Sequence, residues 1–355
     1  MTSACSGRAS RQMDKLANLP SGKGTEYPVF LFSLPACKFA NLPLPICTFT
    51  NKTAMQVTIL GNSSGGPFQG RNFTAQLVTL ENEAYLVDCG EGTQHQLFRF
   101  KIRHDHIRQI FISHLHGDHV FGLMGILTSF CLKKRTEPLV IYGMTGLRTL
   151  VETTSAVCGI HYPYQLDIHE VDAEQHALVF ESPKLEVWSI PLVHRGPCSG
   201  WLFREKQRPR NIRAEKITEY AIPFPLIPGI KAGEDLVLPD GRRIPNAELT
   251  LDPPKPRTYA FCSDTLPSDR VAEIVKGVDL LYHEATFTNE HILEAELSSH
   301  STAAQAAEIA QKAGVGRLLL GHFSGRYKDE AQHLAEAQAV FKNVSVATEG
   351  AAYQP

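Results

Sequence analysis

Four side chains of the kinds that bind metal ions lie within six residues of one another, in the segment FISHLHGDHVFGL at 111–123. They form the pattern HxHxDH and are His114, His116, Asp118 and His119. The apolar run before them predicts a buried strand that ends at Ser113, and Val120–Leu127 predicts an apolar helix after them. A polar loop with chance histidines is the alternative, but a buried strand end is a costly place for three unpartnered imidazoles. Imidazoles and a carboxylate suit zinc, and four ligands this close suit two ions better than one.

Three more residues of these kinds follow, each at the end of an apolar run. His194 follows Leu185–Val193, Asp264 follows 257–263, and His322 follows Val315–Gly321. Taken singly, each would fit an ordinary polar residue at a strand end. Because ligands gather at the carboxyl ends of strands in layered α/β folds, we expect the three to join the HxHxDH cluster at one edge of a sheet.

The order of these ligands resembles that of metallo-β-lactamase-fold hydrolases, and the finer resemblance is to the ribonuclease Z family, which trims the 3′ end of precursor tRNA. Besides FISHLHGDHVFGLMGIL (111–127), the segments that carry the resemblance are YLVDCGEGTQHQL (85–97), PLVHRGPCSGW (191–201), PPKPRTYAFCSDT (253–265), YHEATF (282–287), HSTAAQAAEIA (300–310) and LLLGHFSGRY (318–327). The resemblance spans Met55 to about Val346. It implies an α/β fold, a four-layer αββα metallo-β-lactamase sandwich with an inserted flexible arm.

The resemblance also implies a role for each candidate residue. One zinc ion would be held by His114, His116 and His194, the other by Asp118, His119 and His322, and Asp264 would bridge them; Mn²⁺ or Fe²⁺ in place of zinc stays open. Asp118 would also accept a proton from the attacking water, and His300, oriented by Glu284, would donate one to the leaving ribose oxygen. Ser301 and Thr302 open a strong helical sequence, so His300 also suits the start of a helix.

The chain divides into a short extension and one catalytic domain. We expect 1–54 to be a poorly ordered N-terminal extension, because its prolines exclude a transmembrane helix and it has no clear signal sequence. We expect 55–355 to be the catalytic domain, with a tRNA-binding arm inserted at about 204–250. Residues 204–216 hold six basic and two acidic side chains, which suits phosphate contacts, although an ordinary solvated surface is the alternative. The following IPFPLIPG departs from the glycine-proline tip of bacterial relatives.

Composition limits the class of protein. A hydrophobic content of 43% supports a large core, and a net charge of −2 argues against a globally basic nucleic-acid binder. Eight cysteines without CxxC pairs fit a reduced, cytoplasmic protein. The resemblance further implies a homodimer that acts on precursor tRNA, with no membrane partner.

We therefore expect a zinc-dependent endoribonuclease that leaves a 3′-hydroxyl on the tRNA and a 5′-phosphate on the trailer. The main alternative is a hydrolase of the same fold that acts on small phosphodiesters or esters. A non-catalytic RNA-binding relative is disfavoured, because all seven ligand positions and both proton-transfer candidates are present.

Overall fold

The computed structural model describes residues 54–66, 68 and 70–355, so the expected extension at 1–54 lies, except for Ala54, outside the described residues. Two seven-stranded sheets form its centre. In the first, the strand order is β20 (Ala352–Tyr353), β1 (Gln56–Gly61), β3 (Ala75–Leu80), β4 (Glu83–Val87), β5 (Ile107–Phe111), β6 (Leu139–Met144) and β7 (Leu166–Val171). In the second, it is β19 (Val344–Val346), β17 (Arg317–Gly321), β16 (Leu280–Glu284), β15 (Thr258–Cys262), β10 (Ser199–Glu205), β9 (Leu185–Pro191) and β8 (Leu178–Glu181).

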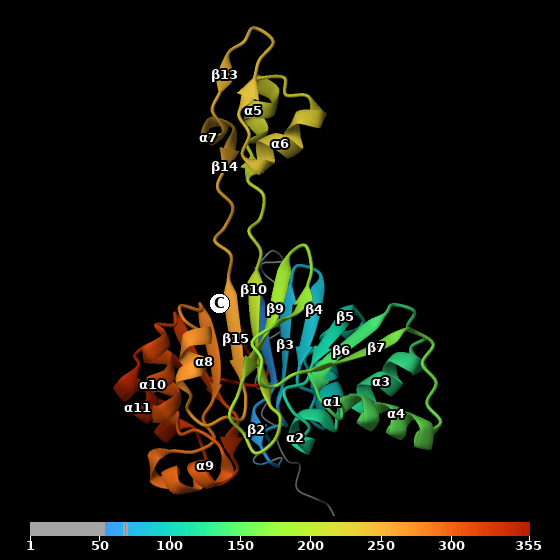
Figure 1. Cartoon of the computed structure of the whole chain (residues 1–355), viewed down its shortest axis with the longest axis vertical. Helices are drawn as coiled ribbons and strands as arrows, with labels where there is room; N and C mark the ends of the chain where they lie inside the picture. The colour runs from blue at the N-terminus through green and yellow to red at the C-terminus, as the bar shows by residue number, and fades with distance from the viewer. Residues whose placement is uncertain (1–53, 67, 69) are drawn as a thin grey trace, which may run out of the picture. The chain divides into compact units, whose positions relative to one another are not determined.

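Helices cover the outer face of each sheet (Figure 1). The first sheet is covered by α1 (Thr93–Arg99), α3 (Leu123–Leu132) and α4 (Leu147–Cys158), and the second by α8 (Asp269–Ile274), α10 (Ala303–Ala313) and α11 (Ala331–Val340). Three apolar cores separate the layers, and the middle one packs Phe111 of the first sheet against Trp201 and Phe203 of the second. The expected four-layer αββα sandwich is therefore confirmed.

Parallel pairing brings the carboxyl ends of several strands to a common edge. In the first sheet β4, β5, β6 and β7 are parallel neighbours, and in the second β15, β16, β17 and β19 are. The strands that precede His194, Asp264 and His322 are β9, β15 and β17, which end at Pro191, Cys262 and Gly321. β5 ends at Phe111, two residues before the expected Ser113.

The helix expected at Val120–Leu127 is split into α2 (Gly117–Val120) and α3. The two meet at Gly122, which lies so close to the preceding loop that a Cβ there would be 2.1 Å from the carbonyl oxygen of Gly90. A side chain at this position is therefore excluded, and the break lets α2 present Asp118 and His119 before α3 begins.

The chain between β10 and β15 forms a small separate module, which we call the arm (206–257). It contains β11 (Asn211–Ile212), α5 (Ala214–Glu219), α6 (Ile227–Ala232), β12 (Leu236–Val237), β13 (Arg243–Ile244), α7 (Asn246–Leu249) and β14 (Thr250–Leu251). Ile222, Ile230, Leu236 and Leu249 form its own core. Arg204 and Glu205 belong to β10, so the arm begins slightly later than the expected 204.

None of the helices in 54–355, masked positions 67 and 69 aside, is long and apolar enough to span a membrane.

Candidate metal centre and catalytic site

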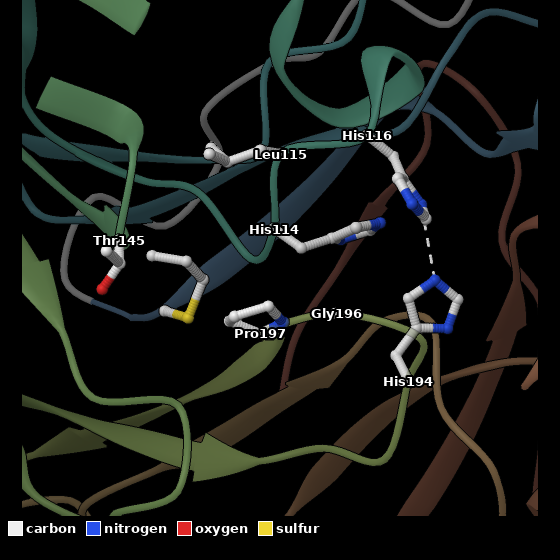
Figure 2. Close-up of a pocket in the computed structure, with 8 residues that line it drawn as sticks. His114, Leu115, His116, Thr145, His194, Gly196 and Pro197 are labelled. Atoms are coloured by element: carbon white, nitrogen blue, oxygen red, sulfur yellow. Dashed lines mark hydrogen bonds between the residues drawn. The ribbon is translucent and has the colours of Figure 1, made fainter. Parts of the chain in front are cut away.

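The structure brings all seven predicted ligands together. The ligand atoms of His114, His116, His194 and Asp264 lie within 4.8 Å of one another, as do those of Asp118, His119 and His322. We call His114, His116 and His194 the first ligand group, and Asp118, His119 and His322 the second. Figure 2 shows the rings of the first group pointing toward one another, with Nε2 of His194 3.4 Å from Nδ1 of His116.

Asp264 lies between the two groups and presents one carboxylate oxygen to each. Its Oδ2 is 3.5 Å from Nε2 of His114 and 3.8 Å from Nε2 of His194. Its Oδ1 is 3.4 Å from Nε2 of His119 and 3.2 Å from Nε2 of His322. This arrangement suits a carboxylate that bridges two cations.

The charge states of His114, His194 and Asp264 suit metal binding at neutral pH. Burial lowers the pKa of His114 to about 4 and also lowers the pKa of His194, so both imidazoles are neutral. Burial would raise the pKa of Asp264, but the imidazoles of His322 and His119 hold it well below its usual value. Metal ions bind neutral imidazoles and ionised carboxylates. Burial would lower the pKa of His119, but the carboxylates of Asp264 and Asp88 raise it well above its usual value, so an ion that binds this ring displaces a proton.

One buried atom in this cluster lacks a hydrogen-bond partner among the described residues, and it is Nε2 of His114. A buried polar nitrogen without a partner is costly, and a cation at the centre of the first group would supply the missing interaction. Five imidazoles and two carboxylates are a donor set that suits two divalent transition-metal ions.

Asp88, which the sequence reasoning did not select, fixes the orientation of a ligand in the second group. This buried carboxylate follows β4 with a φ of 56°, and its Oδ2 lies 2.7 Å from Nδ1 of His119. It also accepts hydrogen bonds from the N–H and Oγ–H of Ser113. A carboxylate on the outer nitrogen of a metal-binding histidine sets its tautomer and leaves Nε2 for the ion. The only sequence signal was the position of Asp88 at a strand end, in 85–97.

Two other candidate ligands, His322 and His194, are also held through the outer nitrogen of the ring, by a hydroxyl and by a carbonyl oxygen. Nδ1 of His322 lies 2.9 Å from Oγ1 of Thr286, whose hydroxyl donates to Glu284, so the ring N–H donates to this oxygen. Nδ1 of His194 lies 2.9 Å from the carbonyl oxygen of Ser299. Both rings therefore direct Nε2 toward the ligand cluster.

Asp118 lies at the start of α2 and joins the second group through one oxygen. Its Oδ2 is 3.6 Å from Nε2 of His119 and 3.5 Å from Nε2 of His322. The same oxygen accepts a hydrogen bond from the N–H of Gly65, 2.8 Å away, so the loop after β1 also helps to hold this carboxylate.

The half-buried His300 and the buried Glu284 form a pair beside the two groups. Nδ1 of His300 lies 2.9 Å from Oε1 of Glu284, and the His300 ring contacts those of His194 and His322 at 5.2 and 5.4 Å between centroids. Burial lowers the pKa of His300, but the Glu284 carboxylate outweighs this effect and raises it to about 9. The expected helix start is also present, because Thr302 caps α10 through a reciprocal capping box with Gln305. His300 is thus held rigidly with Nε2 left to interact with a substrate.

The basic segment at 204–216 is largely paired with acidic residues. Arg210 lies 2.6 Å from Asp252, Lys216 lies 2.9 Å from Glu219, and Lys206 pairs with Glu181. Sequence spacing could not reveal these partners, because most of them come from distant parts of the chain. The segment is therefore less free to bind phosphates than its composition alone indicates.

Comparisons with known proteins show which families this chain resembles. Residues 55–163 match the family model described as anti-Pycsar protein Apyc1. The chain is 45% identical over 296 residues to ribonuclease Z of Porphyromonas gingivalis, covering 83% of this chain and 97% of that protein. It is 43% identical over 294 residues to ribonuclease Z of Bacteroides fragilis, again covering 83% and 97%.

Solved structures agree as well. The human short-form tRNase Z (ELAC1) is 25% identical and aligns with a TM-score of 0.61, covering 84% of this chain and 98% of that one. The metallo-β-lactamase fold protein YhfI of Bacillus subtilis is 19% identical, with a TM-score of 0.61 over 85% of this chain and 100% of that one, and shows the shared fold.

Proposed function

The chain belongs to the ribonuclease Z family and is an endoribonuclease that processes the 3′ end of tRNA, and we propose that it removes the trailer with two zinc ions held by the seven ligands. His114, His116 and His194 would hold one ion, Asp118, His119 and His322 the other, and Asp264 both. When bound, such ions supply a hydroxide nucleophile near neutral pH and offset negative charge on the phosphoryl oxygens.

The protein's own side chains would handle the protons. Asp118, held by the N–H of Gly65, is placed to accept a proton from the attacking water. His300 donates the proton of Nε2 to the ribose 3′-oxygen as the P–O3′ bond breaks. Glu284 holds the ring by its Nδ1–H and stabilises the imidazolium before transfer. The products would be a 3′-hydroxyl on the tRNA and a 5′-phosphate on the trailer.

The remaining parts of the proposal concern the arm, the oligomeric state and the location of the enzyme in the cell. The arm would contact the tRNA away from the cleaved bond, and the enzyme would work as a homodimer. The five cysteines among the described residues are all free thiols, which supports a reducing, cytoplasmic location.

The observation that carries the proposal is the position of Asp264, with one carboxylate oxygen facing each ligand group and the His300–Glu284 pair alongside. The direct test is to incubate the zinc-loaded protein with a 3′-extended tRNA precursor and to map both products at nucleotide resolution. We expect one cut after the unpaired nucleotide that follows the acceptor stem. Hydrolysis of small phosphodiesters without cutting of the tRNA precursor would refute the proposed function.

A further inference from the structure

A short loop after β1 is linked to two ligands of the second group that come from distant parts of the chain. We call residues 62–66 the clamp; it contains β2 (Ser63–Ser64), which Figure 1 shows near α2. The two ligands are Asp118, which lies on α2, and His322, which follows β17. The proposed chemistry uses only one contact of the clamp, the hydrogen bond that holds Asp118.

The clamp contacts Asp118 through a backbone group. The N–H of Gly65 donates a hydrogen bond to Oδ2 of Asp118 at 2.8 Å. This is the oxygen that lies 3.6 and 3.5 Å from Nε2 of His119 and of His322, so it is the one that would face an ion in the second group. The position of the Gly65 N–H therefore helps to fix where this ligand oxygen lies.

The turn that presents this N–H depends on a left-handed backbone conformation. Gly65 has a φ of +65°, and a Cβ there would have no other heavy atom of the described residues within 4 Å apart from those of its chain neighbours. The hydroxyl of Ser63 donates to the carbonyl oxygen of Gly66, and the N–H of Gly66 donates to that of Ser64, both at 2.7 Å. A side chain at Gly65 would thus strain the turn through its φ and not through a clash.

The clamp also holds the chain directly after His322. This ligand has a φ of 59°, which is uncommon for a residue other than glycine. The N–H of Phe323 donates to the carbonyl oxygen of Asn62 at 2.9 Å, and β18 (Phe323–Ser324) pairs with β2. Because such conformations persist only where the surrounding structure holds them, the clamp supports the conformation of His322.

The clamp itself is anchored in the core. The side chains of Asn62 and Ser63 are buried, and Nδ2 of Asn62 donates to the carbonyl oxygen of Ala347. The N–H groups of Asn62 and Ser63 both donate to the carbonyl oxygen of Asn72 at 3.0 Å. Among the residues that the structure describes, the clamp makes no hydrogen bond to a member of the first group.

We propose that the clamp positions Asp118 and His322 together, and that its conformation sets how tightly the second group binds its ion. This inference rests on the proposed function, which assigns one of two zinc ions to that group. Gly65 is a positioning residue, because it acts through Asp118. The loss of a residue that orients a metal ligand typically weakens metal binding 10–100-fold, whereas the first group should be unaffected.

The test measures the affinity for each zinc ion by titrating the metal-free, full-length protein with Zn²⁺ in the presence of a competing chelator. Gly65→Val places a β-branched residue at a positive φ, so we expect one of the two ions to bind about tenfold more weakly or worse, and the other to bind as in the wild type. Gly65→Asn should stay close to the wild type, because asparagine tolerates the left-handed conformation. Gly277→Val is the matched control, since Gly277 is exposed, has a φ of +68° and is equally open, but lies in the turn after α8.

Two further backgrounds identify which ion is affected. His116→Ala disrupts the first group, and adding Gly65→Val to it should weaken the remaining ion about tenfold. His119→Ala disrupts the second group, and adding Gly65→Val to it should leave the affinity for the remaining ion unchanged. A general disturbance of the fold would not distinguish the two backgrounds.

Three results would overturn the inference: unchanged zinc affinities in Gly65→Val, equal weakening of both ions, or the same loss in Gly65→Asn as in Gly65→Val. If Gly65→Val does not fold, Gly65→Ala imposes a milder strain at the same φ, and its zinc affinities decide the question in the same way. Fewer than two zinc ions bound to the wild-type protein would instead refute the two-ion assignment of the proposed function, which is a different result.

Discussion

At the scale of single residues, Asp264 should decide whether two ions bind as a pair. Its two oxygens face different ligand groups, so Asp264→Ala is expected to lower the metal content below two ions per subunit. Cleavage should fall by at least about a hundredfold, since even the loss of a residue that only supports a metal ligand costs 10–100-fold. Metal analysis and single-turnover assays would check this, with circular dichroism to verify folding. The control is Asp269→Ala, which removes an exposed carboxylate on α8 that pairs with Lys312. Two bound ions per subunit and near-normal turnover in Asp264→Ala would contradict the assignment of Asp264 as the bridging ligand.

His300 should matter only when the leaving group needs a proton. His300→Ala is expected to slow precursor tRNA cleavage by about a hundredfold or more, the usual contribution of a positioned general acid. Bis(p-nitrophenyl) phosphate should be affected far less, because nitrophenolate leaves without protonation. The measurement is the ratio of the two losses, with metal content determined in parallel.

The control for that comparison is His161→Ala, which removes an exposed histidine after α4 and should leave both activities unchanged. Equal losses on the two substrates in His300→Ala would indicate that His300 only supports the structure at the start of α10. The ratio thus separates proton donation from a structural role.

At the scale of elements, the packing of α11 should make stability depend on pH through His333. Its buried ring packs on Phe323 and Tyr327, and burial, helped by the nearby Arg71, lowers the pKa of His333 to about 4 from its usual 6.5. The folded state therefore keeps the ring neutral. Burial of the neutral ring therefore costs no stability above about pH 6.5, whereas at lower pH the unfolded state gains a proton that the folded state does not bind. The free energy of unfolding should fall by about 1 kcal/mol between pH 7.5 and 5.5, and should go on falling toward pH 4.

Urea unfolding of metal-free protein at these two pH values would measure this effect. His333→Leu, which cannot titrate, should show about 1 kcal/mol less change in the free energy of unfolding than the wild type. His161→Leu, at an exposed site, should keep the wild-type change. An unaltered pH dependence in His333→Leu would show that the ring is not held neutral in the folded protein.

The arm is an element that can be removed without breaking the pairing of β10 with β15. The N–H of Glu205 donates to the carbonyl oxygen of Arg257 at 2.9 Å, so residues 206–256 can be replaced by an Asn-Gly turn between paired strands β10 and β15. The deleted stretch carries nine basic and seven acidic side chains, so the loss of positive charge is modest. We expect weaker binding of precursor tRNA. We also expect the logarithm of the binding constant to fall less steeply with the logarithm of the salt concentration, with a slope smaller by about one unit or more, because fewer counterions are released.

Activity of the arm-deleted protein on bis(p-nitrophenyl) phosphate should survive, because all seven ligands lie outside the deleted stretch. Binding titrations at several salt concentrations would measure the slope. An unchanged affinity and slope would show that the arm does not contact the RNA phosphates.

At the scale of the whole molecule, the sequence predicted the layers and the clustering of the seven candidate ligands because both depend on short patterns. Apolar runs mark strands, and a ligand directly after such a run is placed at the sheet edge whatever the strand order. Asp88 was missed because nothing in its local sequence shows that it reaches His119. The clamp was missed for a similar reason, since its contacts with Asp118 and Phe323 join segments that are distant in sequence. Long-range ion pairs in the arm, such as that of Arg210 with Asp252, likewise depend on tertiary contacts.

The proposed metal centre would join the two halves of the fold, and this leads to a prediction for the whole protein. His114, His116 and His119 follow a strand of the first sheet, whereas His194, Asp264 and His322 follow strands of the second. Ions bound across this boundary stabilise the folded state only, by about 4 kcal/mol at a free concentration a thousand times Kd. The melting temperature should therefore rise with free zinc set by metal buffers, and fall on chelation. Asp264→Ala should show a weaker rise, while Asp269→Ala should follow the wild type. A melting temperature that does not change while metal content does would mean that the ions do not link the two sheets.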